Sequence, residues 1–282
     1  MSKTSGDRAV RALPPRTFKY ASRGPIRVAR TESHALHRHL VGRTVWHYEA
    51  LESTNDAAKE ALGDELPEGL VIVADRQVAG RGRHGRSWAS PPGGLYFSMV
   101  LRPKDAAHAA LLGLLMGQPV VKALRHFGVL AQLKWPNDVV YQGRKIAGIL
   151  SEGVHRHDVF YAIVGIGVNT NLDLERLPED VRGRATSLRR EVSLYVANEE
   201  FLDYTLDQAD LVYSRYLNTP PEILLRDYRG LCATIGRRVR VTAGRERLEG
   251  RAYDLAPSGA LIVVDDVGAK HEVLDGTVEH LS

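Results

Sequence analysis

The sequence has a single cysteine and no long apolar run. Because Cys232 has no second cysteine to pair with, an intramolecular disulfide is excluded. The longest apolar runs, residues 70–74 and 109–116, are far shorter than the roughly 20 residues that a membrane-spanning helix needs. The N-terminal region also lacks the basic start and apolar core of a secretory signal. We therefore expect a protein of a reducing, cytoplasmic compartment without a membrane partner.

An excess of positive charge is missing from most of the chain, although the net charge of the whole is +4. Residues 1–43 contain ten Lys or Arg against two Asp or Glu, a net of +8, whereas the remaining residues contain 28 against 32, a net of −4. This distribution weakens the case for a nucleic-acid-binding body. With three prolines and no sustained apolar period, the basic segment predicts a flexible N-terminal tail. A DNA-binding arm or an organelle-targeting segment remains an alternative for it.

The length of 282 residues predicts one large domain and a smaller one. Helices are predicted after the polar cluster at residues 53–56, over residues 106–127 and over residues 201–217. The second of these must tolerate Pro119. Strands are predicted at residues 44–49, 70–74, 95–101, 138–141, 145–152 and 159–166. After Gly230, short alternating segments separated by turn residues predict a small all-β module of barrel size.

Residues 80–88 form a loop that contains three arginines among three glycines. Its spacing approaches that of a phosphate-binding P-loop, but Arg86 stands where that motif has lysine, and prolines and a strand follow instead of a helix. A P-loop is therefore excluded. The loop can still bring backbone amides and guanidinium groups close to phosphate oxygens. Taken alone, the loop leaves a solvated basic turn or a nucleic-acid contact as alternatives.

Two other patterns resemble known sites only superficially. Gly165 and Gly167 follow a strand, but Thr170 replaces the third glycine of a dinucleotide-binding fingerprint. Histidines at positions 34, 37 and 39, and at 155 and 157, lack cysteine partners or a helical carboxylate framework. We interpret these histidines as surface residues and exclude a Rossmann-type site.

Residues 134–138 and 144–149 flank a predicted hairpin that places an amide, a carboxylate and a lysine at its ends. Asn137 can pair with a polar edge, and Asp138 can hold Mg²⁺ or fix a partner. Lys145 can direct a charge at a carboxylate or phosphate. Alone, this pattern is more typical of a turn with a surface salt bridge.

The order and spacing of these segments resemble those of the biotin protein ligases. The resemblance rests on residues 53–55, on Gln77 with the 80–88 loop, and on the segments 134–138, 145–148 and 165–169. It covers about residues 44–175, and residues 236–278 look like the C-terminal SH3-like barrel of that family. It implies an α+β fold, in which a mixed sheet with covering helices, like that of class II tRNA synthetases, precedes the barrel. The implied units are a basic tail at 1–43, a catalytic domain at 44–230 and the barrel at 231–282.

The resemblance implies that ATP activates biotin to biotinyl-5′-AMP, with release of pyrophosphate, before a lysine of a biotin carboxyl carrier protein or domain attacks. Biotin and ATP are then the substrates, and Mg²⁺ accompanies them. A lipoate or octanoate ligase is the alternative with the same architecture, and a DNA-binding regulator is the non-enzyme alternative. Because the 43-residue tail is too short for a winged helix-turn-helix, the monofunctional type without specific DNA binding is expected. Dimers are common in the family, so a homodimer is also an expectation.

The resemblance also implies roles for individual residues. The biotin-binding set is Ser53, Thr54, Asn55, Gln77, Arg81, Gly82, Arg83, Lys145 and Gly148. The ATP-binding set is Arg83, Arg86, Trp88, Asn137, Asp138, Lys145 and Asn169. Lys145 and Arg83 are the implied catalytic residues, and Asp138 is the implied metal ligand. Such roles suit the chemistry, since a neutral urea needs neutral hydrogen-bonding groups and a developing pentacoordinate phosphate needs cations.

Overall fold

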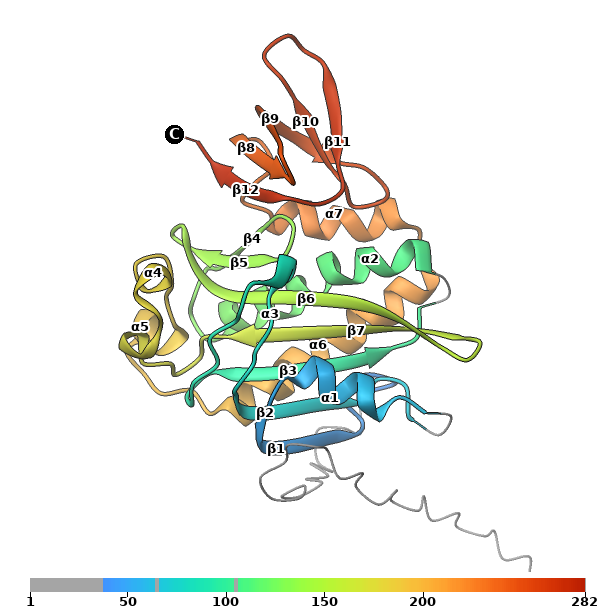
Figure 1. Ribbon diagram of the computed structural model, residues 1–282, viewed down its shortest axis with the longest axis vertical. Helices are drawn as coiled ribbons and strands as arrows, with labels where there is room; N and C mark the ends of the chain where they lie inside the picture. Colours follow the sequence, from blue (N-terminus) through green and yellow to red (C-terminus); the bar gives the residue numbers. More distant parts are fainter. Residues whose placement is uncertain (1–37, 64–65, 104–105, 282) are drawn as a thin grey trace, which may run out of the picture.

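The computed structural model describes residues 38–63, 66–103 and 106–281, so most of the predicted tail lies outside the described residues. Its architecture is a seven-stranded mixed sheet with helices on both faces and a separate five-stranded antiparallel sheet formed by the C-terminal residues (Figure 1). None of the helices in the described residues is long and apolar enough to cross a membrane.

The large sheet has the strand order β1-β2-β3-β7-β6-β5-β4. Its strands are β1 (Val45–Leu51), β2 (Val71–Gln77), β3 (Leu95–Leu101), β4 (Gln132–Lys134), β5 (Asp138–Tyr141), β6 (Arg144–Arg156) and β7 (Val159–Val168). The β1–β2 pair is parallel and the other pairs are antiparallel. The predicted mixed sheet is therefore confirmed, and the ends of the predicted strands fall within four residues of the observed ends, whereas β4 was not predicted.

Alternate residues of the central strands enter two different cores. In β2, Val71 and Val73 pack into the larger core, while Ile72 and Ala74 pack into the smaller one on the opposite face. This alternation follows from the period of two in a β-strand. Helix α1 (Thr54–Ala61) covers the smaller core. The other face is covered by α2 (Ala106–Leu115), α3 (Gly117–His126) and α6 (Asn198–Asn218) (Figure 1).

The single helix predicted over residues 106–127 is wrong, because the chain forms two helices there. The break lies at Met116, which places Pro119 in the first turn of α3. A proline in a first turn lacks only an N–H that would have no intrahelical partner, whereas within a continuous helix it would remove a hydrogen bond and clash. Pro119 is therefore the physical reason for the break.

The C-terminal sheet has the order β11-β10-β9-β8-β12 and is antiparallel throughout. Its strands are β8 (Arg238–Ala243), β9 (Glu246–Leu255), β10 (Leu261–Val264), β11 (Lys270–Val273) and β12 (Thr277–His280). Between the two sheets the chain forms short helices η3 (Leu174–Arg176), α4 (Glu179–Arg182) and α5 (Leu188–Val192), then α6 and α7 (Pro221–Leu231). The predicted all-β texture is confirmed, whereas α7 was not anticipated.

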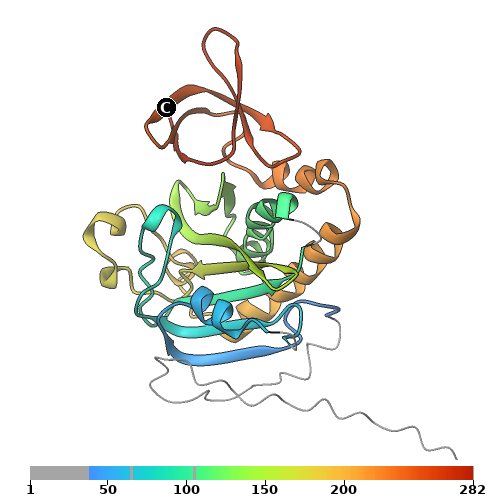
Figure 2. The same cartoon turned by 45° about the vertical axis from the view of Figure 1, so that its right-hand side comes forward.

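The C-terminal sheet is attached to the large sheet through Trp135. This side chain is only 1% exposed, and its Nε1 donates to the carbonyl of Gly259, 3.0 Å away. Two residues before Trp135, in β4, the carbonyl of Leu133 accepts a hydrogen bond from the amide of Ala233 at 2.7 Å. The small sheet consequently lies over the β4–β5 edge of the large one (Figures 1 and 2).

Candidate functional site

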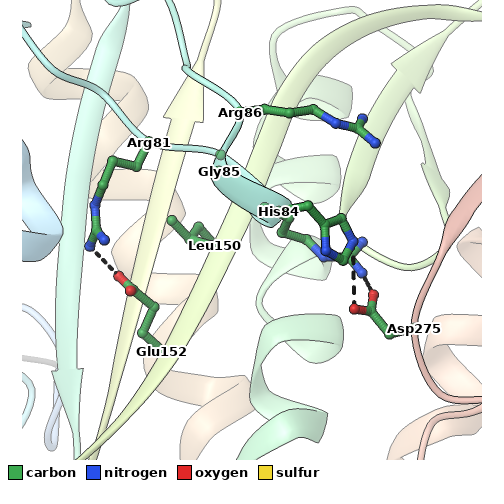
Figure 3. Close-up of a pocket in the computed structure, with 9 residues that line it drawn as sticks. Arg81, His84, Gly85, Arg86, Leu150, Glu152 and Asp275 are labelled. Atoms are coloured by element: carbon green, nitrogen blue, oxygen red, sulfur yellow. Dashed lines mark hydrogen bonds and ion pairs between the residues drawn. The ribbon is translucent and has the colours of Figure 1, made fainter. Parts of the chain in front are cut away.

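The candidate site lies on the face of the large sheet that also carries α1. Two features cover this face where β6 and β7 cross it, namely the first turn of α1 and the 80–88 loop. A cavity of about 350 Å³ opens between the loop, β6 and the C-terminal sheet. Figure 3 shows Arg81 and Glu152 on one side of this cavity and His84, Arg86 and Asp275 on the other.

A network of neutral polar groups occupies the α1 end of the site. The amide and hydroxyl of Thr54 donate to Gln77 Oε1 at 2.8 and 3.2 Å, and Gln77 Nε2 donates to Ser90 Oγ at 2.9 Å. Ser98 Oγ donates to Thr54 Oγ1 at 2.7 Å, and both residues are buried. Ser53, the N-cap residue of α1, is buried beside them. These groups are oriented by one another before any ligand contacts them.

A carboxylate that the sequence did not single out organises the next part of the site. Glu152 accepts hydrogen bonds from Asn55 Nδ2 at 2.7 Å, Lys59 Nζ at 2.7 Å and Arg81 Nη2 at 2.6 Å. Burial raises the pKa of Glu152, but the hydrogen bonds from Lys59 and Asn55 and the charges of Lys59 and Arg81 outweigh it, so the net pKa is lowered. The carboxylate therefore stays ionised and holds both Asn55 and Arg81 in place.

The 80–88 loop is a compact turn rather than an extended chain. The amide of Gly82 donates to the carbonyl of Arg86 at 2.7 Å, and the amide of Trp88 donates to the carbonyl of Gly80 at 2.8 Å. A Cβ atom on Gly80 would lie 2.4 Å from the Trp88 carbonyl oxygen, so only glycine fits there. At its tip, His84 adopts the left-handed conformation with φ of 55°.

Trp88 packs against two glycines of neighbouring strands. A Cβ atom on Gly148 would lie 3.0 Å from Trp88 Cζ3, and one on Gly167 would lie 2.4 Å from Trp88 Nε1. Lys145 Nζ lies 5.1 Å from the centre of the indole ring, within the range of a cation–π contact. Among the described residues, no partner accepts a hydrogen bond from the buried Trp88 Nε1.

Cations gather at the end of the site where β4 and β5 meet. Lys145 Nζ lies 2.5 Å from Asp138 Oδ1, and Arg83 Nη1 donates to Asn137 Oδ1 at 2.8 Å. Burial lowers the pKa of Arg83; the charge of Asp138 raises it and that of Arg86 lowers it further. In the described part of the chain, no group of three His, Cys, Asp or Glu side chains could hold a metal ion, so Asp138 does not belong to such a group.

Two predicted nucleotide-binding residues form hydrogen bonds outside the cation cluster. Asn169 is 4% exposed and its Nδ2 donates to the carbonyl of Thr186 at 2.9 Å, which ties the segment before α5 to β7. Arg86 Nη2 donates to Thr277 Oγ1 of β12 at 2.7 Å. Figure 3 shows Arg86 extending away from Arg81, which faces Glu152.

Sequence reasoning missed several residues that shape the site. Ser98 did carry a signal, because it is the one polar residue in the apolar run 95–101. Glu152, at the end of a predicted strand, carried a weaker signal. Asp275 and Thr277 carried none, since only the docking of the two sheets brings them to the loop.

Comparisons with known proteins agree with this geometry. The model of the Biotin/lipoate A/B protein ligase family matches residues 48–169, and that of the Biotin protein ligase C terminal domain matches residues 234–281. A biotin–(acetyl-CoA carboxylase) ligase of Mycobacterium tuberculosis is 34% identical over 236 residues, which cover 79% of this chain and 83% of that protein. Its counterpart in Paracoccus denitrificans is 35% identical over 229 residues, covering 77% and 92%.

A solved structure is similar over most of both chains. The biotin protein ligase from Aquifex aeolicus in complex with biotin and ATP has a TM-score of 0.74 at 30% sequence identity, and the match covers 84% of this chain and 99% of that one. Two family models and relatives that align over most of their own length leave little of the large sheet or of the C-terminal sheet unmatched. The chain therefore belongs to the biotin protein ligase family.

Proposed function

We propose that this chain uses ATP to convert biotin to biotinyl-5′-AMP and pyrophosphate, and then transfers biotin to a lysine of a biotin carboxyl carrier protein or domain. The observation that carries the proposal is the juxtaposition, on one sheet face, of a neutral network around Thr54 and Gln77 with a cation cluster around Lys145. The names of the two relatives and the biotin and ATP in the Aquifex complex support the same reaction.

The neutral network suits the ureido ring of biotin. Ser53, Thr54, Asn55 and Gln77 offer hydroxyl and amide groups, which match an uncharged urea without the desolvation cost of a charge. The position of Asn55 supports this role, since its Oδ1 lies so close to Gly165 that a Cβ atom there would be 2.1 Å away. The absence of a side chain at Gly165 lets the amide approach the sheet.

The cation cluster suits the step in which two anions meet. We assign Lys145 to the space between the biotin carboxylate and the α-phosphate, where a fixed ammonium offsets their repulsion and stabilises the transition state. Arg81, Gly82 and Arg83 line the activated carboxyl group and phosphate in this proposal, and Gly148 leaves room beside Lys145. In support, a Cβ atom on Gly148 would lie 3.1 Å from Lys145 Cε.

The remaining residues are assigned to the nucleotide. Trp88 offers an indole face and an N–H that has no acceptor among the described residues, Arg86 offers a charge from the loop, and Asn169 is assigned to the adenine edge. Mg²⁺ prefers one or two carboxylates together with substrate phosphates, and the carboxylate of Asp138 beside Asn137 fits such a site. When bound there, Mg²⁺ would neutralise phosphate charge.

Transfer completes the proposed reaction. The neutral ε-amine of the acceptor lysine attacks the carbonyl carbon of the mixed anhydride, the bond to the phosphate oxygen breaks, and AMP leaves. The amine must lose a proton before it attacks. We expect a folded carrier domain to be labelled faster than a free peptide that contains the same lysine.

The finer organisation is also proposed. We assign residues 44–230 to the catalytic domain, residues 231–282 to an SH3-like barrel and residues 1–43 to a basic tail without specific DNA binding. The catalytic domain is taken as class II tRNA-synthetase-like, the protein as cytoplasmic, and a homodimer as its assembly. The five-stranded antiparallel sheet and the single cysteine support parts of this assignment.

Biotin-dependent exchange of labelled pyrophosphate into ATP tests the proposed function. We expect exchange with biotin, and little exchange with lipoate or octanoate at equal concentration, because a neutral hydrogen-bonding network has no counterpart in those acyl chains. Exchange driven by lipoate or octanoate would support the alternative ligase instead. Purified protein that exchanges with none of the three acids would contradict both.

A further inference from the structure

We infer that Asp275, which lies on the turn before β12, is a positioning residue that holds Arg83 for the adenylate by an ion pair from the C-terminal sheet. This inference rests on the phosphate-binding role proposed for Arg83. It makes the C-terminal sheet a structural part of the active site rather than an appendage.

Arg83 needs an acidic partner from outside its own loop. Residues 80–88 contain no Asp or Glu, and the nearby charge of Arg86 repels the guanidinium. Asp138 lies close, but its carboxylate pairs with Lys145 at 2.5 Å. Among the described residues, the carboxylate in direct contact with Arg83 is that of Asp275, which pairs with Nη2.

Two further contacts join the loop to this part of the C-terminal sheet. His84 Nε2 lies 3.5 Å from Asp275 Oδ2, and Arg86 Nη2 donates to Thr277 Oγ1 at 2.7 Å. In Figure 3, Asp275 projects from the C-terminal segment toward His84 at the tip of the loop. Arg83, His84 and Arg86 of the loop therefore contact Asp275 on the turn and Thr277 at the start of β12.

The turn that presents Asp275 is held rigidly. Asp275 Oδ1 accepts a hydrogen bond from the amide of Gly276 at 2.8 Å, which orients the carboxylate. A Cβ atom on Gly276 would lie 2.9 Å from the carbonyl oxygen of Thr242, so the turn is pressed against β8. Thr277 then pairs with Thr242 in the β12–β8 ladder.

The guanidinium of Arg83 is therefore held from two directions. Asn137, after β4, accepts from Nη1 at 2.8 Å, while Asp275 contacts Nη2. Because the Asp275 side chain is 54% exposed, the ion pair is accessible to dissolved salt. Loss of this pair should free the guanidinium to rotate, which weakens its contact with a phosphate but leaves the distant ureido network unchanged.

The test compares Asp275→Asn and Asp275→Glu with Asp266→Asn. Asp266 is an exposed carboxylate of the same sheet that pairs with Arg238 at 2.7 and 2.8 Å, away from the loop, so it serves as the matched control. For each protein, the dissociation rate of biotinyl-5′-AMP and the Kd for biotin alone are measured at low and high salt. An exposed pair gives effects of two- to fivefold.

We expect Asp275→Asn to raise the dissociation rate of the adenylate about two- to fivefold, without changing the Kd for biotin, and Asp275→Glu to recover most of the loss. The difference from the unsubstituted protein should shrink at high salt, which a purely structural defect would not do. Tighter retention in Asp275→Asn would show that Asp275 competes with the phosphate and would overturn the inference. Equal rates in Asp275→Asn and Asp266→Asn would overturn it as well.

Arg83→Ala separates this inference from the proposed function. If the unsubstituted protein forms no biotinyl-5′-AMP, the proposed function fails. If it forms the intermediate, Arg83→Ala should release it faster, and adding Asp275→Asn to Arg83→Ala should cause no further increase, because the pair is already broken. If the two substitutions raise the dissociation rate additively, Asp275 does not act through Arg83, and the positioning role is contradicted while the proposed function is not.

Discussion

At the scale of single residues, Lys145 is held more firmly than an ordinary surface lysine. Its backbone is bracketed by the segment before α5, because its amide donates to the carbonyl of Arg184 at 2.8 Å and its carbonyl accepts from the amide of Thr186 at 2.9 Å. Its ammonium lies against Asp138 and over Trp88. A charge held in this way loses little free energy to reorganisation when a negative transition state forms.

Lys145→Ala should therefore leave the fold intact and lower adenylate synthesis by about 10²- to 10³-fold, which corresponds to about 3–4 kcal/mol. Biotin-dependent pyrophosphate exchange measures the loss. The control is Lys270→Ala, since Lys270 is an exposed lysine of the C-terminal sheet that stacks on Tyr253. Exchange within about tenfold of the unsubstituted protein would contradict the role of Lys145.

His280 makes stability depend on pH. Burial, followed by the positive charges of Lys134 and Arg237, lowers its pKa from 6.5 to about 4. As the pH falls below 6.5, the unfolded chain binds the proton and the folded chain does not, so stability is lost down to about pH 4. The ring is partly exposed, and we expect its share of the loss between pH 7 and 5 to be about 1 kcal/mol.

Urea unfolding of the unsubstituted protein and of His280→Gln at pH 7 and 5 measures this share. Between pH 7 and pH 5, the free energy of unfolding of His280→Gln should fall by about 1 kcal/mol less than that of the unsubstituted protein, because glutamine does not titrate. The comparison of differences cancels the contribution of carboxylates that titrate in both proteins. Identical losses would show that the ring is not protonated on unfolding in this range.

At the scale of elements, β6 and β7 supply a floor of glycines for Trp88. Gly148 and Gly167 are directly paired across the two strands, and the indole lies over both. Gly167→Ala should displace the indole, because its Cβ atom would lie 2.4 Å from Nε1. We expect the KM for ATP to rise about tenfold while the fold persists, since extended backbone accepts alanine.

The KM for ATP in pyrophosphate exchange checks this expectation. Gly183→Ala, at the end of α4, is the matched control, because a Cβ atom there meets nothing within 4 Å. An unchanged KM in Gly167→Ala would mean that the position of Trp88 does not matter for nucleotide binding.

Elements with strong local signals were predicted well. The hairpin between β5 and β6 was expected from a short turn, and its two central residues, Gln142 and Gly143, both have positive φ, as a tight primed turn requires. The strand at residues 95–101 matches β3 at both ends. The single helix over residues 106–127 failed because apolar periodicity does not reveal where a proline can be accommodated.

At the scale of the whole molecule, Trp135 joins the two sheets. In addition to the side-chain hydrogen bond, the backbone amide of Trp135 donates to Oγ1 of Thr234 at 3.1 Å, and Thr234 is fully buried. Trp135→Ala should lower the free energy of unfolding by about 3–5 kcal/mol, because it leaves a large cavity. Trp135→Phe should cost much less, since it loses mainly the hydrogen bond to Gly259.

Urea unfolding measures both losses, and Tyr253→Ala, which truncates an aromatic side chain that is 58% exposed, is the control. Trp135→Ala should also release biotinyl-5′-AMP faster, because Asn137 lies two residues further along the chain and Asp275 depends on the docking. An unchanged free energy of unfolding in Trp135→Ala would show that the packing of the two sheets against each other does not depend on this side chain.

Deletion of residues 1–31 should leave biotinylation of the carrier nearly unchanged, because that segment contains none of the site residues. The cut spares Arg38 and the three following amides, which bind Asp203, Asp207 and Asp210 of α6. Incorporation of labelled biotin measures the activity.

Any DNA binding by the full chain should be nonspecific and steeply salt-dependent. A sequence-specific footprint at moderate salt would contradict the monofunctional assignment.

The sequence by itself determined the elements and the chemistry of most site residues, because hydrophobic period, turn residues and capping act over a few neighbouring positions. Thr54, Gln77, Arg83 and Lys145 were named from such local patterns together with the family resemblance. Only the tertiary structure decided which carboxylate each cation contacts. Glu152 and Asp275 are separated from their arginines by 71 and 192 positions, so their meeting depends on sheet pairing and on the docking of Trp135, which no local pattern encodes.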